Sequence, residues 1–405
     1  MSGNRKKILS GALAFLFLMG IVSLFSDMTH EGARSVLGEF LNLSGATAGT
    51  IGFISGFGEL LGYGLRILSG RLADKTKHYW TLVITGYVLQ VLAIPALALV
   101  PEHGWIAACG LVLLERIGKA VKKPAKNTLV SFASSEIGQG KGFAYMEFLD
   151  QLGAFIGPVI LFIVSLIKGT DNLIGTYRLC FLFLGIPALI TIALVVAARF
   201  KYPHPEMFEK AREENTGFVY RSSFALYMAA ICLFAFGFAD FTLITLHAAK
   251  LQVFPESTLS LLYSLAMLTD AFAALFFGWL YDRIGLKALM LSNVLSSCFG
   301  IFVFLFKSPV TLLIGVSLWG IGMGAQESIM KAAVSGMLPA SMRSTGFGIF
   351  ETGFGIFWFL GSWCLGLLYE VSIPLMAGIS AGSQLLAILF YYLSVRAEKK
   401  QKRKA

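Results

Sequence analysis

The chain carries the polar stretch Gly278-Trp-Leu-Tyr-Asp282-Arg283-Ile-Gly285-Leu-Lys287 directly after a long apolar run. A weaker copy, Gly70-Arg-Leu-Ala-Asp74-Lys75-Thr-Lys77, follows an apolar run in the first half and lacks the internal glycine. A polar loop that recurs at the same place in two halves of a 405-residue apolar chain indicates an origin by duplication. The sequence should therefore fold as two similar halves.

The composition indicates a membrane protein. Hydrophobic residues make up 56% of the chain and charged residues 14%, and the mean hydropathy is +0.74, whereas a soluble domain carries about 25% charged residues. Apolar runs of about 20 residues, long enough to cross a bilayer as helices, recur along the chain. We predict an all-α membrane protein with about twelve transmembrane helices, near residues 8–36, 46–68, 79–100, 104–124, 142–166, 177–198, 222–248, 257–280, 287–306, 309–334, 344–369 and 373–395.

The distribution of basic residues predicts the orientation. One set of alternating loops holds most lysines and arginines, and the opposite set shows only Lys168, Arg178, Lys250 and Lys307. We therefore expect a multi-pass protein of the inner membrane with both termini in the cytoplasm. The net charge of +10 then reflects this topology and attraction to anionic lipid, and it gives no reason to expect a nucleic-acid partner.

One sizeable hydrophilic segment divides the chain. We predict a six-helix bundle at 1–200, a cytoplasmic central loop at 201–221, a second six-helix bundle at 222–396 and a basic cytoplasmic tail at 397–405. The two bundles should be pseudo-symmetric because of the repeated loop. We expect the protein to be a monomer.

Two carboxylates recur at matching places of the two halves. Aligning Phe25-Ser-Asp27 with Phe238-Ala-Asp240 pairs one aspartate with another, and aligning Gly142-Phe-Ala-Tyr-Met-Glu147 with Gly346-Phe-Gly-Ile-Phe-Glu351 pairs two glutamates. A charge at the centre of a bilayer costs about 2.5–3.5 kcal/mol on insertion scales, so such groups face an aqueous path or pair internally. The sequence therefore predicts functional carboxylates in both halves.

The first and fourth helices hold further charges. Asp27, His30, Glu31 and Arg34 share one face of the first helix by their spacing, unless this end of the helix has already left the membrane. In the fourth helix we assign Arg116 and Lys119 to the solute path, with Glu115 as an i,i+4 partner of Lys119. The stripe continues to Lys123 and Lys126, which we expect at the cytoplasmic end against lipid headgroups.

The fifth helix combines charges with a packing motif. Its candidate path residues are Glu147 and Asp150, and Gly153, Gly157 and Pro158 should allow close packing and a bend. Glu327 and Lys331, four residues apart in the tenth helix, form either a local pair or part of the path. Asp270 in the eighth helix is a further candidate for a buried charge.

These motifs resemble the major facilitator superfamily (MFS). The repeated loop is similar to its signature G-x-x-x-D-R/K-x-G-R/K-K/R, Leu-Glu-Arg116-Ile-Gly118 to its fourth-helix motif, and Gly153-Ala-Phe-Ile-Gly157-Pro158 to an element of its exporters. The resemblance implies two six-helix bundles around a cavity lined mainly by helices 1, 4, 7 and 10, with alternating access. It also implies that the loops are conformational latches, built from Gly70, Asp74, Lys75, Gly278, Asp282, Arg283 and Gly285.

We therefore expect a secondary transporter for a small polar, zwitterionic or anionic solute, coupled to protons and more suited to export than import. Two alternatives stay open: a divalent-metal exporter of the ferroportin-like branch, with Asp27, His30, Glu31, Asp240 and His247 as donors, and a non-transporting sensor on a transporter fold. No nucleophile, metal-spaced cysteine pair or phosphate-binding loop is evident. We expect no enzyme activity, no cofactor and no resident metal.

Overall fold

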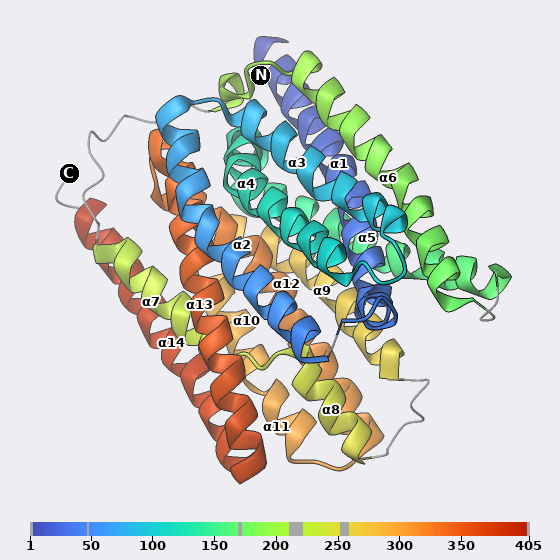
Figure 1. Ribbon diagram of the computed structural model, residues 1–405. Helices are drawn as coiled ribbons and strands as arrows, with labels where there is room; N and C mark the ends of the chain where they lie inside the picture. Colours follow the sequence, from blue (N-terminus) through green and yellow to red (C-terminus); the bar gives the residue numbers. More distant parts are fainter. Residues whose placement is uncertain (1–2, 47, 169–171, 210–221, 252–258, 403–405) are drawn as a thin grey trace. The chain divides into compact units, whose positions relative to one another are not determined.

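The computed structural model describes residues 3–46, 48–168, 172–209, 222–251 and 259–402, and within these ranges every regular element is helical (Figure 1). The first half contains α1 (Gly3–Leu43), α2 (Ala48–Thr76), α3 (Tyr79–Ala96), η1 (Leu97–Leu99), α4 (Trp105–Ile137), α5 (Gln139–Lys168), α6 (Leu173–Lys201) and η2 (Pro205–Phe208). The second half contains α7 (Ser222–Gly237), α8 (Phe241–Leu251), α9 (Leu259–Ile284), α10 (Lys287–Ser297), α11 (Phe299–Phe304), α12 (Pro309–Met337), η4 (Ala340–Met342), α13 (Arg343–Val371) and α14 (Ile373–Lys402).

The prediction of an all-α chain with about twelve spans is confirmed. Nine helical segments of the described ranges are long and apolar enough to cross a membrane, and α7 is a shorter apolar helix. The segment Lys287–Phe304 counts as one of the nine although α10 and α11 divide it. Glycines and charges lower the hydropathy of α2 and α4, and these two helices with the α7–α8 pair complete the twelve.

The predicted span 222–248 is not one continuous helix, since α7 ends at Gly237 and α8 begins at Phe241. Other side chains satisfy the carbonyls that the break releases. Ser380 Oγ donates to Gly237 O (2.6 Å), and Trp319 Nε1 donates to Ala239 O (2.9 Å). Donors for freed carbonyls allow such an interruption inside a membrane protein.

The chain divides into two compact units. Unit 1 comprises Met1–Ile137, Leu149–Arg212 and Ala340–Ile349, and unit 2 comprises Gly138–Phe148, Glu213–Pro339 and Phe350–Ala405. Thus the first residues of α5 belong to unit 2, and the first residues of α13 belong to unit 1. Of the expected central loop 201–221, residues 210–221 lie outside the described residues, as do 403–405 of the expected tail 397–405 and 257–258 of the expected span 257–280.

Small residues allow close helix packing in each unit. In unit 1, a Cβ at Gly153 or Gly157 of α5 would collide with backbone carbonyls of α1, and Pro158 lies inside α5. In unit 2, a Cβ at Gly361 of α13 would collide with the carbonyl of Phe236 in α7. Gly157 and Gly361 occupy matching places of the internal repeat, so the two halves use the same device to bring a helix pair together.

Candidate functional site

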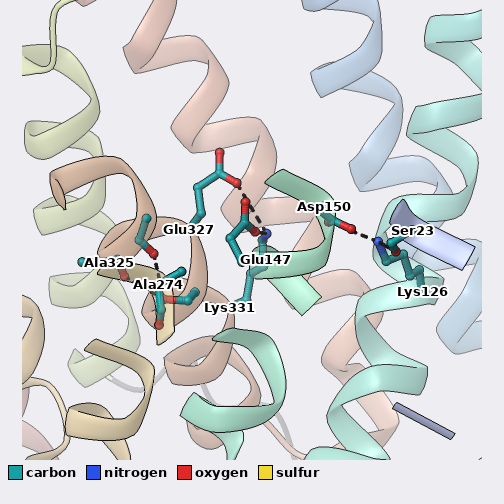
Figure 2. Close-up of polar contacts among 10 residues, drawn as sticks. Ser23, Lys126, Glu147, Asp150, Ala274, Ala325, Glu327 and Lys331 are labelled. Atoms are coloured by element: carbon teal, nitrogen blue, oxygen red, sulfur yellow. Dashed lines mark hydrogen bonds and ion pairs between the residues drawn. The ribbon is translucent and has the colours of Figure 1, made fainter. Parts of the chain in front are cut away.

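A buried lysine of unit 2 lies between two glutamates. Lys331 Nζ on α12 is 2.8 Å from Glu147 Oε2 at the start of α5 and 3.8 Å from Glu327 Oε2 one helical turn away (Figure 2). The side chain of Glu147 is 3% exposed and that of Glu327 is 30% exposed. Glu327 and Lys331 therefore do form the local pair that their spacing allows, and Glu147 adds a closer and more deeply buried carboxylate.

Two further carboxyl groups of unit 2 interact with this lysine cluster. Asp270 on α9 is fully buried and interacts electrostatically with Glu147 and Glu327, while Glu351 on α13 is 4% exposed and interacts with Lys331. Gly324 on α12 leaves the room that Asp270 occupies, because a Cβ there would lie 2.7 Å from Asp270 Oδ1. The cluster thus contains four carboxyl groups, Glu147, Asp270, Glu327 and Glu351, and one ammonium group.

A histidine network occupies the α1–α4 contact of unit 1. His30 Nδ1 lies 3.0 Å from Glu115 Oε1, and His30 Nε2 lies 3.1 Å from Lys119 Nζ and 3.5 Å from Glu31 Oε1. Glu115 contacts Arg116 Nε at 3.5 Å. The expected Glu115–Lys119 pair is therefore replaced by contacts of both residues with His30, which lies between them and is 4% exposed.

Arg34 lies at the exposed end of the same helix face. Its guanidinium is 3.6 Å from Glu31 Oε2, and its side chain is 58% exposed. Asp27, His30 and Glu31 thus lie in the interior or at its edge, while Arg34 is largely accessible.

Two buried lysines of α4, Lys122 and Lys126, were not assigned to the solute path from the sequence. Lys122 Nζ donates to Ser26 Oγ (3.0 Å) and lies 3.6 Å from the centroid of the Tyr87 ring. Lys126 Nζ donates to Ser23 Oγ and lies 3.5 Å from Asp150 Oδ2 (Figure 2). The placement of Lys126 against lipid headgroups is wrong, because its side chain is 11% exposed and packs against α1 and α5.

Asp27 is part of the same lysine-rich interior. It interacts electrostatically with Asp150 and with Lys119, Lys122 and Lys126. The signal for these lysines was present in the sequence, because positions 119, 122 and 126 share one helix face by their spacing of three and four. The prediction from the sequence followed instead the stripe that passes through Lys123.

Asp240 stands at the break between α7 and α8. Its backbone carbonyl accepts the N–H of Leu243 in the first turn of α8, and its Oδ2 lies 3.4 Å from Trp358 Nε1. The ring of Trp358 in turn packs against Phe238, at a centroid separation of 5.5 Å. Asp240 therefore lies beside a helix end and an aromatic cluster.

The two signature aspartates cap helix N-termini. Asp74 Oδ1 and Oδ2 accept the backbone N–H groups of Ser344 (3.2 Å) and Thr345 (2.6 Å) at the start of α13. The pKa of the Asp74 carboxyl is raised by burial, and the hydrogen bonds from Thr345 and Ser344 oppose this shift. A carboxylate at this place also interacts favourably with the helix dipole.

Asp282 makes the equivalent contacts in unit 2. Its Oδ1 and Oδ2 accept the N–H groups of Gly140 (2.8 Å) and Lys141 (2.9 Å) at the start of α5. Gly140 and Lys141 are the counterparts of Ser344 and Thr345 in the alignment that pairs Glu147 with Glu351. The internal repeat read from the sequence thus corresponds to two matching capping interactions.

The other signature residues shape these loops. Gly70 and Gly278 lie where a Cβ would collide with Ser344 and Ala144 respectively, and Gly285 has φ +64°. Lys77, at the matching place in the first loop, also takes a positive φ, +57°, so the missing glycine is replaced by a strained residue. Lys75 and Arg283 are exposed, and the Arg283 guanidinium lies 3.9 Å from the centroid of the Trp279 ring.

The donors of the metal alternative are not brought together within either unit. Asp27, His30 and Glu31 belong to unit 1 and Asp240 and His247 to unit 2. His247 Nδ1 lies 3.0 Å from Tyr369 Oη. Among the described residues, no group of three or more His, Cys, Asp or Glu side chains is arranged to hold a metal ion.

Comparison with known proteins identifies the family. The family model described as Major Facilitator Superfamily matches residues 8–254 and 240–405. The chain belongs to this superfamily of membrane transporters.

Two relatives match most of the chain. A protein of Mycobacterium tuberculosis strain H37Rv, described as uncharacterized, is 34% identical over 94% of this chain and 93% of its own length. An uncharacterized MFS-type transporter of Methanocaldococcus jannaschii is 24% identical over 88% of this chain and 89% of its own.

Solved structures share the fold at low identity. A bacterial homologue of the iron transporter ferroportin in an outward-facing state has a TM-score of 0.72 at 15% identity, with 94% of this chain and 99% of that chain covered. The transporter FucP in the outward conformation has a TM-score of 0.71 at 14% identity, with 95% and 99% covered. These similarities show the fold and leave the solute open.

Proposed function

We propose that this chain is a secondary active transporter that moves a small polar, zwitterionic or anionic solute by alternating access, coupled to protons and in the export direction. The observation that carries the proposal is the lysine cluster of unit 2, in which Lys331 faces four carboxyl groups. The proposal places the protein in the inner membrane as a monomer with both termini in the cytoplasm, where the basic loops favour them. The export direction rests on the resemblance of the run that contains Gly153, Gly157 and Pro158 to an element of exporters of this superfamily.

The charge count of the lysine cluster supports proton coupling. Four carboxyl groups interact with one ammonium group, and three of them, Glu147, Asp270 and Glu351, are buried. Burial and neighbouring carboxylates both disfavour the ionised form of a carboxyl group, so such a cluster can take up protons. The cluster can then exchange protons whenever a conformational change opens it to water on one side.

The buried polar groups of unit 1 support a polar solute. Lys119, Lys122 and Lys126 on one face of α4 meet Asp27 and Asp150, so the surface carries both signs of charge. A zwitterion, or an anion that exchanges with an internal carboxylate, can be bound by such a mixed set at low cost because each buried charge keeps a partner. We assign Asp27, His30, Glu31, Arg34, Arg116 and Lys119 to the solute path of this unit, and Asp240 with the lysine cluster to that of unit 2.

The two capping interactions support alternating access. In each of them a carboxylate in the last turn of α2 or α9 holds the start of a helix whose remaining residues belong to the other unit. A capped helix N-terminus can be released and recaptured as a two-state element, because the bonds involve a single side chain. We therefore propose that Asp74 and Asp282 bias the equilibrium between conformations and do not contact the solute.

The test is proton movement in proteoliposomes that hold the purified protein. Pools of amino acids, organic anions, amines and divalent metals are added, and the internal pH is followed with an enclosed dye. We expect one pool to drive proton movement with wild-type protein and with Glu102→Gln, a control at an exposed residue, and little or none with Glu147→Gln.

Other outcomes would contradict the proposal at defined points. Solute movement that carries no protons would remove the coupling. An equal proton flux in Glu147→Gln would remove the lysine cluster from it. No movement with any pool in tight vesicles would contradict transport itself and favour the sensor. A response to divalent metals alone would favour the metal exporter.

A further inference from the structure

The first residue of α13 is held by an ion pair with the segment that follows α6. Arg343 Nη1 and Nη2 donate to Glu209 Oε2 (2.7 Å) and Oε1 (2.8 Å), and Arg343 Nη1 lies 3.2 Å from Ser131 Oγ. All of these residues belong to unit 1. Arg343 is 1% exposed, so Glu209 supplies the carboxylate for a buried guanidinium in two parallel hydrogen bonds, the strongest geometry for such a pair.

Glu209 is positioned by a short docked segment. The ring of Phe208 is buried and lies 6.0 Å from the rings of Phe15 and Tyr202. Ser135 Oγ of α4 donates to Phe208 O at 2.8 Å, and Trp80 Nε1 of α3 donates to Tyr202 O at 3.1 Å. Residues 202–209 therefore pack on the helices of unit 1, which gives Glu209 a defined position beside Arg343.

The ion pair has no charged counterpart in the internal repeat. The alignment that pairs Ser344 with Gly140 places Gln139 opposite Arg343, and an amide cannot form an ion pair with a carboxylate. The aspartate cap, by contrast, is present in both halves. The α13 start, held by Asp74, and the α5 start, held by Asp282, thus differ in one contact. Only the α13 start has the ion pair of Arg343 with Glu209, which the segment after α6 supplies.

Further contacts hold the start of α13 and the preceding η4 on the rest of unit 1. Ser344 Oγ lies 2.6 Å from Thr128 Oγ1, and Lys77 Nζ donates to Ser341 O at 2.9 Å. Each of these is a single neutral or exposed hydrogen bond, worth less than a buried bidentate ion pair. Glu209 is therefore the dominant added restraint on this helix start.

We propose that residues 202–209 act as a strap whose Glu209 locks the start of α13 onto unit 1 and makes this latch the slower of the two to release. The strap goes beyond the proposed transport function, since it concerns the equilibrium of the protein without solute. Because Glu209 acts through Arg343 and touches no solute site, it is a positioning residue. Losing its charge should loosen residues 343–349 while leaving the α5 latch unchanged.

Hydrogen exchange of the full-length protein in nanodiscs tests the strap directly. The amides of Ser344 and Thr345 report the α13 latch, because Asp74 is their hydrogen-bond acceptor, and the amides of Gly140 and Lys141 report the α5 latch in the same sample. In Glu209→Gln we expect exchange at the α13 start to rise about tenfold or more, with no change at the α5 start.

Matched variants distinguish a specific restraint on the start of α13 from a general stabilisation of the fold. Glu206→Gln makes the same charge change at an exposed residue of η2 and should leave both latches as in wild type. Glu209→Asp keeps the charge on a shorter side chain and should give an intermediate rise in exchange at Ser344 and Thr345. It replaces Glu209→Gln as the test variant if Glu209→Gln folds poorly. The exchanged pair Glu209→Arg with Arg343→Glu should restore part of the protection.

Two outcomes would overturn the proposal. Unchanged exchange at Ser344 and Thr345 in Glu209→Gln would show that the ion pair does not restrain α13. Equal acceleration at the α13 and α5 starts would show that Glu209 stabilises the whole fold and is no specific lock.

Discussion

The ion pair of Lys331 with Glu147 leads to a quantitative prediction for Glu147→Gln. At an effective dielectric constant of about 20, a pair at 2.8 Å contributes about 6 kcal/mol of attraction and a pair at 3.8 Å about 4 kcal/mol. After the variant, Glu327 can move closer to Lys331 and recover part of the loss. We therefore expect a net destabilisation of about 2–3 kcal/mol, below the 3–5 kcal/mol of a buried pair with no substitute partner.

Thermal unfolding of the purified protein, followed by intrinsic fluorescence, measures this loss. A bundle of about 200 residues should show an apparent melting temperature lower by about 4–12 °C. Glu327→Gln serves as the matched control, because its carboxylate is farther from Lys331 and more exposed. It should cost clearly less than Glu147→Gln.

A double-mutant cycle with Lys331→Met tests the physical cause. If the lysine is the partner, adding Glu147→Gln to Lys331→Met should cost little or should stabilise, because the remaining carboxyl groups repel each other less. Fully additive costs would refute the ion pair as the source of the effect. A Glu147→Gln protein more stable than wild type would show that Glu147 is protonated in the folded state and that another carboxylate neutralises Lys331.

Three further substitutions test the packing and the loops by the same unfolding assay. Asp282→Ala should destabilise by about 1 kcal/mol through loss of a helix cap, and an unchanged stability would contradict the capping role. Gly285→Val should cost about 1–2 kcal/mol because of the positive φ; a neutral result would mean that the loop adopts another conformation. Gly157→Val should cost about 1–3 kcal/mol or prevent folding, because its side chain would enter the α1 backbone, whereas Gly366→Ala, which has open space around it, should be tolerated.

The class of protein and the internal duplication could be read from the amino-acid order. Runs of about 20 apolar residues must become helices in a bilayer, because no other water-free conformation satisfies the backbone. The repeated loops and the Glu147–Glu351 alignment pointed to matching positions, and the structure places matching caps there. These features depend on local spacing, which a one-dimensional pattern records.

The partners of the buried charges depended on tertiary structure. Spacing along one helix paired Glu115 with Lys119 and placed Lys126 at the headgroups, but both lysines face α1, where His30 and Ser23 meet them. The helix break before Asp240 could not be predicted from the sequence for the same reason. The carbonyls of Gly237 and Ala239 accept hydrogen bonds from α14 and α12, which are distant along the chain. A desolvated charge or carbonyl is stabilised by whichever group lies within about 3 Å of it, and that neighbour is often far away along the chain. Periodicity thus determines which residues become helix and share a helix face, whereas only the packing of the helices decides which buried groups meet.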